Sequence, residues 1–299
     1  MISKPNVKIN LGLNVLRKRD DGFHDLETLF IPYFEISDTL EIITGDDYSR
    51  TSAYLQSRYG SPVEAGAPED APCLVQAISE DGKLMITIAR EEGVDWEPLK
   101  DLTARAYFLL SEDFQLPPVK IFLEKTSPVG AGLGGGSSDA AFALKMMNEL
   151  CSLGLSQEHL ALYASRLGSD CAFFIYNSPM IGEGRGEILS PFLFSGSESG
   201  MEDVLPGYEL KVLAPGGIAV STADAYRGIK PRIPELALRE ALARPLSEWK
   251  DVLVNDFENT VFAKYPELAA IKNSLYESGA VYAAMSGSGS AMFAIYEKE

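Results

Sequence analysis

The chain has 299 residues, 46% of them hydrophobic and 23% charged, a composition typical of a globular protein and unlike that of a disordered or collagen-like chain. At roughly 100 to 200 residues per domain, this length predicts about two domains. Its formal net charge is −17. Because nucleic-acid binding depends on neutralising phosphates with basic side chains, we expect no nucleic-acid partner.

The three cysteines Cys73, Cys151 and Cys171 form no CxxC pair, and the chain has two histidines. These counts argue against a disulfide framework, a histidine-rich zinc site and a Ser-His-Asp triad. No stretch approaches the ~20 apolar residues that a membrane span needs. We therefore expect a soluble, cytoplasmic monomer or weak homodimer with no export signal and no membrane partner.

The N-terminal pattern predicts a hairpin. Residues 7–15 alternate apolar and polar side chains, which is typical of a half-buried strand, and Asp21-Gly22 is a turn signal leading into the apolar run 26–34. In chain order the sequence then predicts a strand at 38–44, strands joined by long loops over 45–98, a helix at 101–110, a strand at 119–124, helices at 137–150 and 156–167, a polar acidic loop at 195–207, a strand at 208–213, helical segments from 222 and 246, and a strand-loop-strand around 286–296. We place the domain boundary near residue 155, giving domains 1–155 and 156–299.

The strongest local signal is the glycine segment 128–139, which reads PVGAGLGGGSSD and lies between a predicted strand and a predicted helix. Glycine weakens regular structure, so five glycines in seven positions indicate a backbone that turns tightly or approaches a ligand closely. The helix N-terminus that follows offers free N–H groups and a partial positive charge, which together favour phosphate. The candidate phosphate-binding residues are Pro128, Gly130, Gly132, Gly134, Gly135, Gly136, Ser137 and Ser138.

Other interpretations of the glycine segment are a flexible connection and a dinucleotide-binding turn. The segment matches GxGxxG, but the acidic strand end expected about 20 residues later is absent, and Gly136 stands where a Walker A loop has lysine. Because one helix end cannot balance a triphosphate, we expect Mg²⁺ as a cofactor, with Ser137 or Ser138 as a hydroxyl ligand. Asp139 is either a first-turn acid that stabilises the helix or a metal contact.

Three blocks coincide with this segment and together resemble the GHMP kinase superfamily: Pro5-x-x-Lys8-Ile9-Asn10-Leu11, residues 128–141, and Ser286-Gly287-Ser288-Gly289. Further motifs resemble most the branch that phosphorylates 4-diphosphocytidyl-2-C-methyl-D-erythritol in non-mevalonate isoprenoid biosynthesis. They are Asp21-Gly22-Phe23-His24, Gly168-Ser169-Asp170, Gly184-Arg185-Gly186-Glu187 and Ser221-Thr222. The resemblance spans nearly the whole chain.

The resemblance implies an α+β, two-domain fold with an N-terminal ribosomal-protein-S5-like domain, a C-terminal ferredoxin-like domain and an active site between them. It also implies a small-molecule kinase that uses ATP and Mg²⁺. The glycine segment would hold the ATP phosphates.

The resemblance further implies that Asp170 is the general base and Lys8 its electrostatic partner, with Asn10 holding substrate hydroxyls. From the residues alone, Asp170 is equally a turn or cap acid, Lys8 a solvated lysine and Asn10 an exposed strand residue. The setting of Asp170, between a helix end and the apolar run 171–176, is one that could desolvate a carboxylate.

By the same resemblance Phe23, His24 and Tyr226 line a cytidine pocket, and Thr222 contacts the erythritol or its diphosphate. An aromatic beside an Asp-Gly turn is otherwise a satellite core residue. Phe23 replaces the family's usual tyrosine, and Lys100-Asp101 replaces an expected Asp-Asn pair. The remaining alternatives are a kinase of this superfamily for homoserine or a mevalonate derivative, a nicotinamide-dependent oxidoreductase and a non-catalytic nucleotide-binding module.

Overall fold

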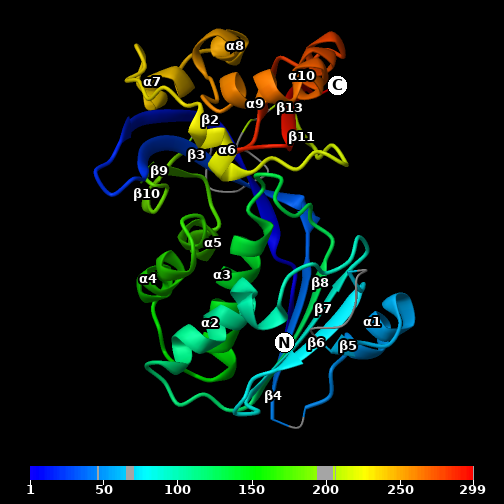
Figure 1. Ribbon diagram of the computed structural model, residues 1–299. Coiled ribbons are helices and arrows are strands. Elements are labelled where there is room, and N and C mark those ends of the chain that lie inside the picture. The colour runs from blue at the N-terminus through cyan, green and yellow to red at the C-terminus, as the bar shows by residue number, and fades with distance from the viewer. Residues whose placement is uncertain (46, 65–70, 194–204, 206, 299) are drawn as a thin grey trace. The chain divides into compact units, whose positions relative to one another are not determined.

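The computed structural model describes residues 1–45, 47–64, 71–193, 205 and 207–298 (Figure 1). Most of the predicted acidic loop 195–207 lies outside these residues. The strands are β1 Ile2–Ser3, β2 Asn6–Lys18, β3 His24–Ser37, β4 Thr39–Thr44, β5 Val63–Glu64, β6 Leu74–Ile78, β7 Leu84–Arg90, β8 Val119–Lys125, β9 Met180–Gly184, β10 Ile188–Pro191, β11 Tyr208–Leu213, β12 Tyr282–Met285 and β13 Met292–Glu297. The helices are α1 Ser52–Tyr59, η1 Pro98–Lys100, α2 Leu102–Ser111, α3 Gly135–Leu150, α4 Gln157–Leu167, α5 Cys171–Tyr176, α6 Thr222–Arg227, α7 Leu238–Leu242, η3 Leu246–Glu248, α8 Trp249–Val252, α9 Glu258–Lys264 and α10 Pro266–Glu277.

The chain forms two compact units that interleave along the sequence. The first unit comprises Met1–Val7, Phe34–Ser127 and Gly135–Tyr176, and the second comprises Lys8–Tyr33, Pro128–Gly134 and Asn177–Glu299. Residue 155 lies inside the last segment of the first unit, and the division predicted there stays a prediction. The predicted α+β class is confirmed.

A six-stranded sheet in the order β1-β4-β8-β7-β6-β5 forms the centre of the first unit. β4 pairs antiparallel with β8, and β8 pairs parallel with β7. Helix α3 packs against this sheet through β4 and is flanked by α2, α4 and α5, whereas α1 packs against β6 and β7 (Figure 1). The strand pairing brings Asp38, just before β4, beside the end of β8, where the glycine segment begins.

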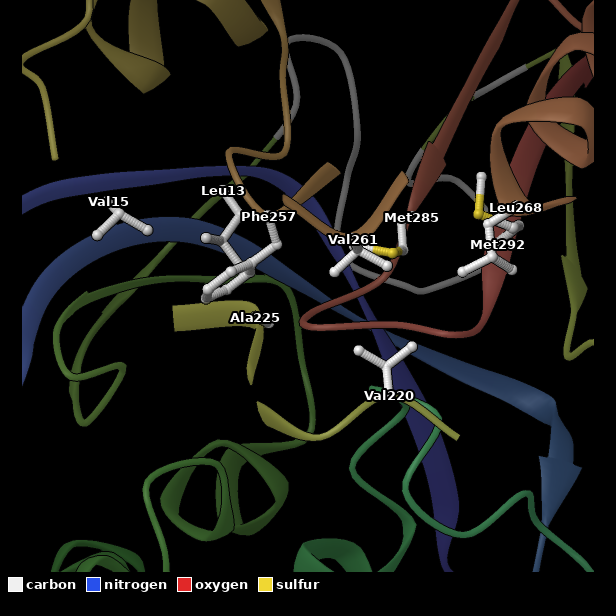
Figure 2. Close-up of a cluster of buried hydrophobic side chains, with 9 residues drawn as sticks. All are labelled: Leu13, Val15, Val220, Ala225, Phe257, Val261, Leu268, Met285 and Met292. Carbon is white, nitrogen blue, oxygen red and sulfur yellow. The ribbon is translucent and has the colours of Figure 1, made fainter. Parts of the chain in front are cut away.

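The second unit holds a four-stranded sheet, β10-β9-β3-β2, and a three-stranded sheet, β11-β13-β12. Its apolar cluster combines side chains from distant parts of the chain (Figure 2). The cluster residues are Leu13, Val15, Val220, Ala225, Phe257, Val261, Leu268, Met285 and Met292. Strand β12, the loop 286–291 and β13 confirm the strand-loop-strand predicted at the C-terminus.

The first strand differs from its prediction, because β2 is buried on both faces and not on one. The polar face is covered: Lys8 and Asn10 are 2% and 3% exposed, and the Asn14 amide donates to Glu27 Oε1 at 3.0 Å. Gly12 lies so close to Leu238 Cδ1 that an added Cβ would be 2.7 Å from it. Alternation therefore identified the strand correctly and its burial wrongly.

Candidate active site

Lys8 is a buried cation tied to the glycine segment. Its Nζ donates to Gly132 O at 2.9 Å and to Asn10 Oδ1 at 2.6 Å, and it lies 5.5 Å from the centre of the Phe30 ring. The solvated-lysine alternative is therefore wrong, as is the exposed-strand alternative for Asn10. A buried charge is costly unless it is hydrogen-bonded, so this placement fixes a positive group beside the loop.

The last glycine loop, which follows β12, also contacts the glycine segment. Ser286 is fully buried, and its Oγ donates to Gly132 O at 3.1 Å and accepts from the Asn10 peptide N–H at 3.3 Å. The Ala291 N–H donates to Ala131 O at 3.0 Å. Asn255, which the sequence pattern did not identify, donates from Nδ2 to Met285 O at 2.7 Å and to Gly287 O at 2.8 Å. Side chains from three regions of the chain thus hold two glycine loops together.

Gly132 is required by this close approach, and we expect Gly132→Ala to be markedly destabilising. Its φ is +78°, and an added Cβ would lie 2.2 Å from Ser286 O. Gly130 is the matched control, since its φ is +71° but nothing lies within 4 Å of an added Cβ. Gly130→Ala should cost about 1–2 kcal/mol for the left-handed backbone alone, and Gly132→Ala should cost more. Equal urea midpoints for the two variants would contradict this packing.

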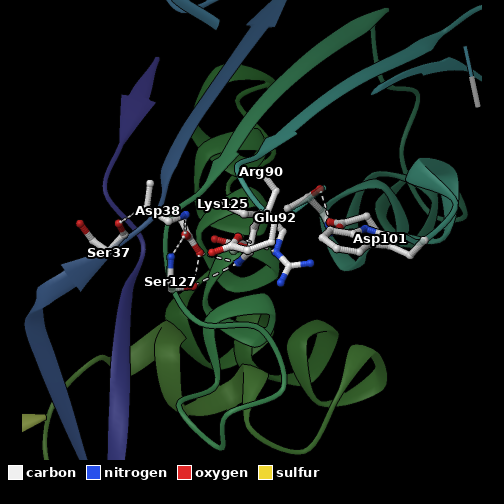
Figure 3. Close-up of polar contacts among 11 residues, drawn as sticks. Ser37, Asp38, Arg90, Glu92, Asp101, Lys125 and Ser127 are labelled. Atoms are coloured by element: carbon white, nitrogen blue, oxygen red, sulfur yellow. Dashed lines mark hydrogen bonds and ion pairs between the residues drawn. The ribbon is translucent and has the colours of Figure 1, made fainter. Parts of the chain in front are cut away.

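Helix α3 starts at Gly135, two residues earlier than predicted, so Asp139 lies in its second turn and the first-turn interpretation is wrong. Asp139 instead contacts Lys125, the last residue of β8, with its Oδ2 2.6 Å from Lys125 Nζ. The same Nζ forms an ion pair with Asp38 (Figure 3). An added Cβ on Gly135 would lie 2.4 Å from Ser127 Oγ and 3.4 Å from Lys125 Nζ, so the helix begins directly against these groups.

Asp38 is the anion of this cluster. Its Oδ1 accepts from the peptide N–H groups of Thr126 and Ser127, both at 2.7 Å, and Ser127 Oγ donates to its Oδ2 at 2.7 Å. Burial favours the protonated form of Asp38, but Lys125 and the hydrogen bonds outweigh it and lower its pKa. No sequence pattern identified this cluster.

Asp139 has the opposite behaviour. It is 1% exposed, and burial raises its pKa well above the ordinary value. The positive charge of Lys125 opposes this increase, and the negative charge of Asp38 adds to it. Burial therefore favours the protonated form of Asp139, whereas Lys125 and the hydrogen bonds favour the ionised form of Asp38.

Two buried oxygens near the start of α3 have no hydrogen-bond partner among the described residues, Ser138 Oγ and Asp139 Oδ1. Ser138 is 0% exposed. Buried polar atoms normally have partners, and Mg²⁺ prefers oxygen ligands, so the free Ser138 hydroxyl fits the predicted metal contact. Within the described residues no group of three or more His, Cys, Asp or Glu side chains could hold a metal ion.

Asp170 lies in the turn between α4 and α5, half-buried, beside the start of α3. An added Cβ on Gly168 would lie 3.2 Å from Cys171 Sγ and 3.9 Å from Ser137 Oγ. The turn that carries Asp170 is thereby packed near Ser137, at the predicted phosphate-binding helix end. Burial raises the pKa of the Cys171 thiol to about 12, so this cysteine packs as a neutral group.

The predicted nucleoside-binding residues lie within the second unit. The His24 and Tyr226 rings are stacked, with centroids 4.8 Å apart and planes 21° apart, and Tyr226 packs edge-on against Phe257 at 4.7 Å. Burial, with a smaller effect of Lys18, lowers the pKa of His24, which favours a neutral imidazole. Phe23 is 54% exposed, so it is not a core residue.

Thr222, at the start of α6, is exposed and lies beside the last glycine loop, with its Oγ1 3.1 Å from Ser288 Oγ. Asp101, which replaces part of the expected Asp-Asn pair, has a structural role at the start of α2. Its carboxylate caps α2, accepting from Thr103 N at 2.9 Å and from Trp96 Nε1 at 3.1 Å. The helices in the described part of the chain are all too short or too polar to span a bilayer.

The chain is similar to known proteins along its whole length. The family described as GHMP kinases N terminal domain matches residues 101–178, and GHMP kinases C terminal matches residues 237–299. A 4-diphosphocytidyl-2-C-methyl-D-erythritol kinase of Bacteroides thetaiotaomicron is 43% identical over 100% of this chain and 93% of its own, and one of Parabacteroides distasonis is 41% identical over 100% and 92%.

A solved structure titled 4-(cytidine 5'-diphospho)-2C-methyl-D-erythritol kinase superposes with a TM-score of 0.69 at 29% identity, covering 98% of this chain and 89% of that one. Matches of this identity over the whole chain establish common descent, and they overturn the nicotinamide-dependent alternative for the glycine segment. The chain therefore belongs to the GHMP kinase family, in its 4-diphosphocytidyl-2-C-methyl-D-erythritol kinase branch.

Proposed function

We propose that this protein transfers the γ-phosphate of ATP to the 2-hydroxyl of 4-diphosphocytidyl-2-C-methyl-D-erythritol, forming ADP and the 2-phosphate. The observation that carries the proposal is the surroundings of the glycine segment. Lys8 Nζ is hydrogen-bonded to its Gly132 carbonyl, and the Asp170 turn packs near its Ser137. The Lys8 contact with Gly132 in the second unit and the packing of the Asp170 turn near Ser137 in the first unit support these two residues as the proposed catalytic groups.

Phosphoryl transfer needs little covalent chemistry from the protein, because alignment and charge compensation dominate. Asp170 accepts the proton of the attacking hydroxyl as the new O–P bond forms and the bond to ADP breaks. Lys8, held by Asn10, compensates negative charge at the acceptor oxygen and the transferred phosphate. The pairing of Lys8 with Asp170 stays a prediction.

The nucleotide phosphates bind to the glycine segment from Pro128 to Ser137. They accept hydrogen bonds from the N–H groups of Gly134, just before α3, and of Gly135 and Gly136, its first two residues. Ser138 Oγ would hold Mg²⁺ together with the phosphates, and the bound ion would neutralise charge on the phosphate oxygens. Phe23, His24 and Tyr226 hold the cytosine, and Thr222 holds the diphosphate or the erythritol.

The direct test is a product assay with purified protein, ATP, Mg²⁺ and the cytidyl substrate, following ADP release and the ³¹P spectrum of the product. We expect turnover that CMP inhibits competitively with the cytidyl substrate. Homoserine and mevalonate are the comparison acceptors. Turnover with either of them and none with the cytidyl substrate would reject the proposed acceptor, and absence of any ATP turnover would leave the non-catalytic alternative.

A further inference from the structure

The turn between β9 and β10 carries a cation, Arg185, to which the proposed function gives no role. β9 pairs antiparallel with β3, and Gly184 lies opposite Leu26 in this register. The next residue, Arg185, therefore lies beside the start of β3, close to Phe23. Its guanidinium carbon is 5.1 Å from the centre of the Phe23 ring, within the range of a cation–π contact.

Phe23 is an unusual platform for a base, because its ring is 54% exposed and has no polar atom. The Phe23 peptide N–H donates to Asp21 Oδ1 at 3.1 Å, which fixes the backbone but not the ring. A tyrosine here would have a hydroxyl to anchor; a phenylalanine must be oriented through contacts with its face and edge. The guanidinium of Arg185 provides such a contact.

Arg185 is itself held in place. Its peptide N–H donates to Glu187 Oε2 at 2.6 Å and its Nε to Glu187 Oε1 at 3.4 Å, within one tight turn. The flanking glycines have positive φ, +69° for Gly184 and +107° for Gly186. An added Cβ on Gly184 would lie 3.2 Å from Glu187 Oε2, so the glycine leaves space for the carboxylate that anchors the arginine.

The second predicted aromatic of the pocket needs no such support. Tyr226 is half-buried, stacked on His24 and packed edge-on against Phe257. Of these two rings, Phe23 is the exposed one, and Arg185 lies against it.

We propose that Arg185, anchored by Glu187, is a positioning residue that holds the Phe23 ring in the orientation in which the pyrimidine of the substrate stacks on it. The inference rests on the proposed function, since it names what makes Phe23 a base platform. Arg185 therefore acts in binding of the cytidyl substrate. It has no part in ATP binding or in the chemical step.

The test is Arg185→Met, which keeps an aliphatic stem and removes the guanidinium. We expect the KM for the cytidyl substrate and the Kd of CDP to rise about 2- to 30-fold, the range of a cation–π contact, with kcat and the KM for ATP unchanged. Arg185→Lys keeps a cation and should give an intermediate value. Arg239→Met is the matched control, because Arg239 also lies over a phenylalanine, Phe192, at 5.9 Å in the same unit, and should change none of these constants.

A double variant distinguishes positioning from direct contact. In a Phe23→Leu background, Arg185→Met should cause no further rise in KM, because the ring on which Arg185 acts is gone. Additive effects, or an unchanged KM in the single variant, would overturn the inference. If the wild-type protein turns over the cytidyl substrate while Arg185→Met behaves like wild type, this inference alone fails; if the wild type does not turn it over, the proposed function fails and the inference with it.

Discussion

Asp170→Asn should lower kcat by about 10²- to 10⁴-fold, the usual contribution of a general base. The amide is nearly isosteric with the carboxylate but cannot accept the proton of the attacking hydroxyl. Because the residues proposed to bind the nucleotide and the cytidyl substrate are unchanged, both KM values should stay within a few-fold of wild type. The measurement is steady-state ADP release with both substrates saturating.

Asp95→Asn is the control for this experiment. Asp95 is an exposed aspartate of the same unit, with a side chain 74% accessible and a long 3.8 Å ion pair to Arg90. Its replacement should leave kcat unchanged. Near-native kcat in Asp170→Asn at saturating substrate would show that another group takes the proton, or that the proton leaves without help from the protein.

The elements that were predicted correctly are those whose signal is local. The capping serine Ser156 and the stop Gly168 bound α4, and the Ser156 Oγ accepts from the His159 N–H as a helix cap does. Strand β11 starts and ends at the predicted residues. In both segments the pattern is complete within about a dozen residues, so tertiary contacts were not needed to recognise it.

The helices that were missed have weak hydrophobic patterns. α1 buries one residue, Leu55, within 45–98, where strands and loops were predicted. α10 likewise buries only Leu268 among twelve residues. The other packed side chains of these helices, such as Tyr59 of α1 and Ile271 of α10, are only partly buried. With one fully buried residue in each helix, the 3.6-residue periodicity that identifies helices is too weak to stand out.

The same distinction applies to the site. The glycine segment, Lys8 and Asp170 were identified from motifs, whereas the contact of Lys125 with Asp38 joins residues 87 positions apart. Only the antiparallel pairing of β4 with β8 places those two side chains together, and a sequence pattern carries no information on that pairing. The first-turn interpretation of Asp139 was wrong because α3 starts two residues earlier than predicted, and its metal-contact interpretation stays a prediction.

Lys125→Met should lower the free energy of unfolding by about 3–5 kcal/mol, since removing one partner of a buried ion pair leaves the other charge uncompensated. Asp38 would keep its hydrogen bonds from Ser127 but lose its cation. The matched control is Asp139→Asn: because burial raises the pKa of this carboxyl group, we expect its replacement by a neutral amide to cost less than the loss of Lys125. Urea unfolding of both variants and wild type measures the difference.

The pH dependence of this pair of variants tests the protonation states. An acid whose folded pKa is raised contributes stability below its unfolded pKa and loses that contribution as pH rises towards the folded value. Between these two pKa values, a range that begins near pH 4, the free energy of unfolding of wild type should therefore fall by about 1.4 kcal/mol per pH unit relative to that of Asp139→Asn. The pH dependence that comes from Asp38 has the opposite sign. Its lowered pKa contributes stability above about pH 4, and this contribution is lost as the pH falls through the folded pKa. If the difference in free energy of unfolding between wild type and Asp139→Asn stays constant from pH 5 to 8, Asp139 is ionised in the folded protein. The cluster would then bury a net negative charge beside the residues proposed to bind phosphate.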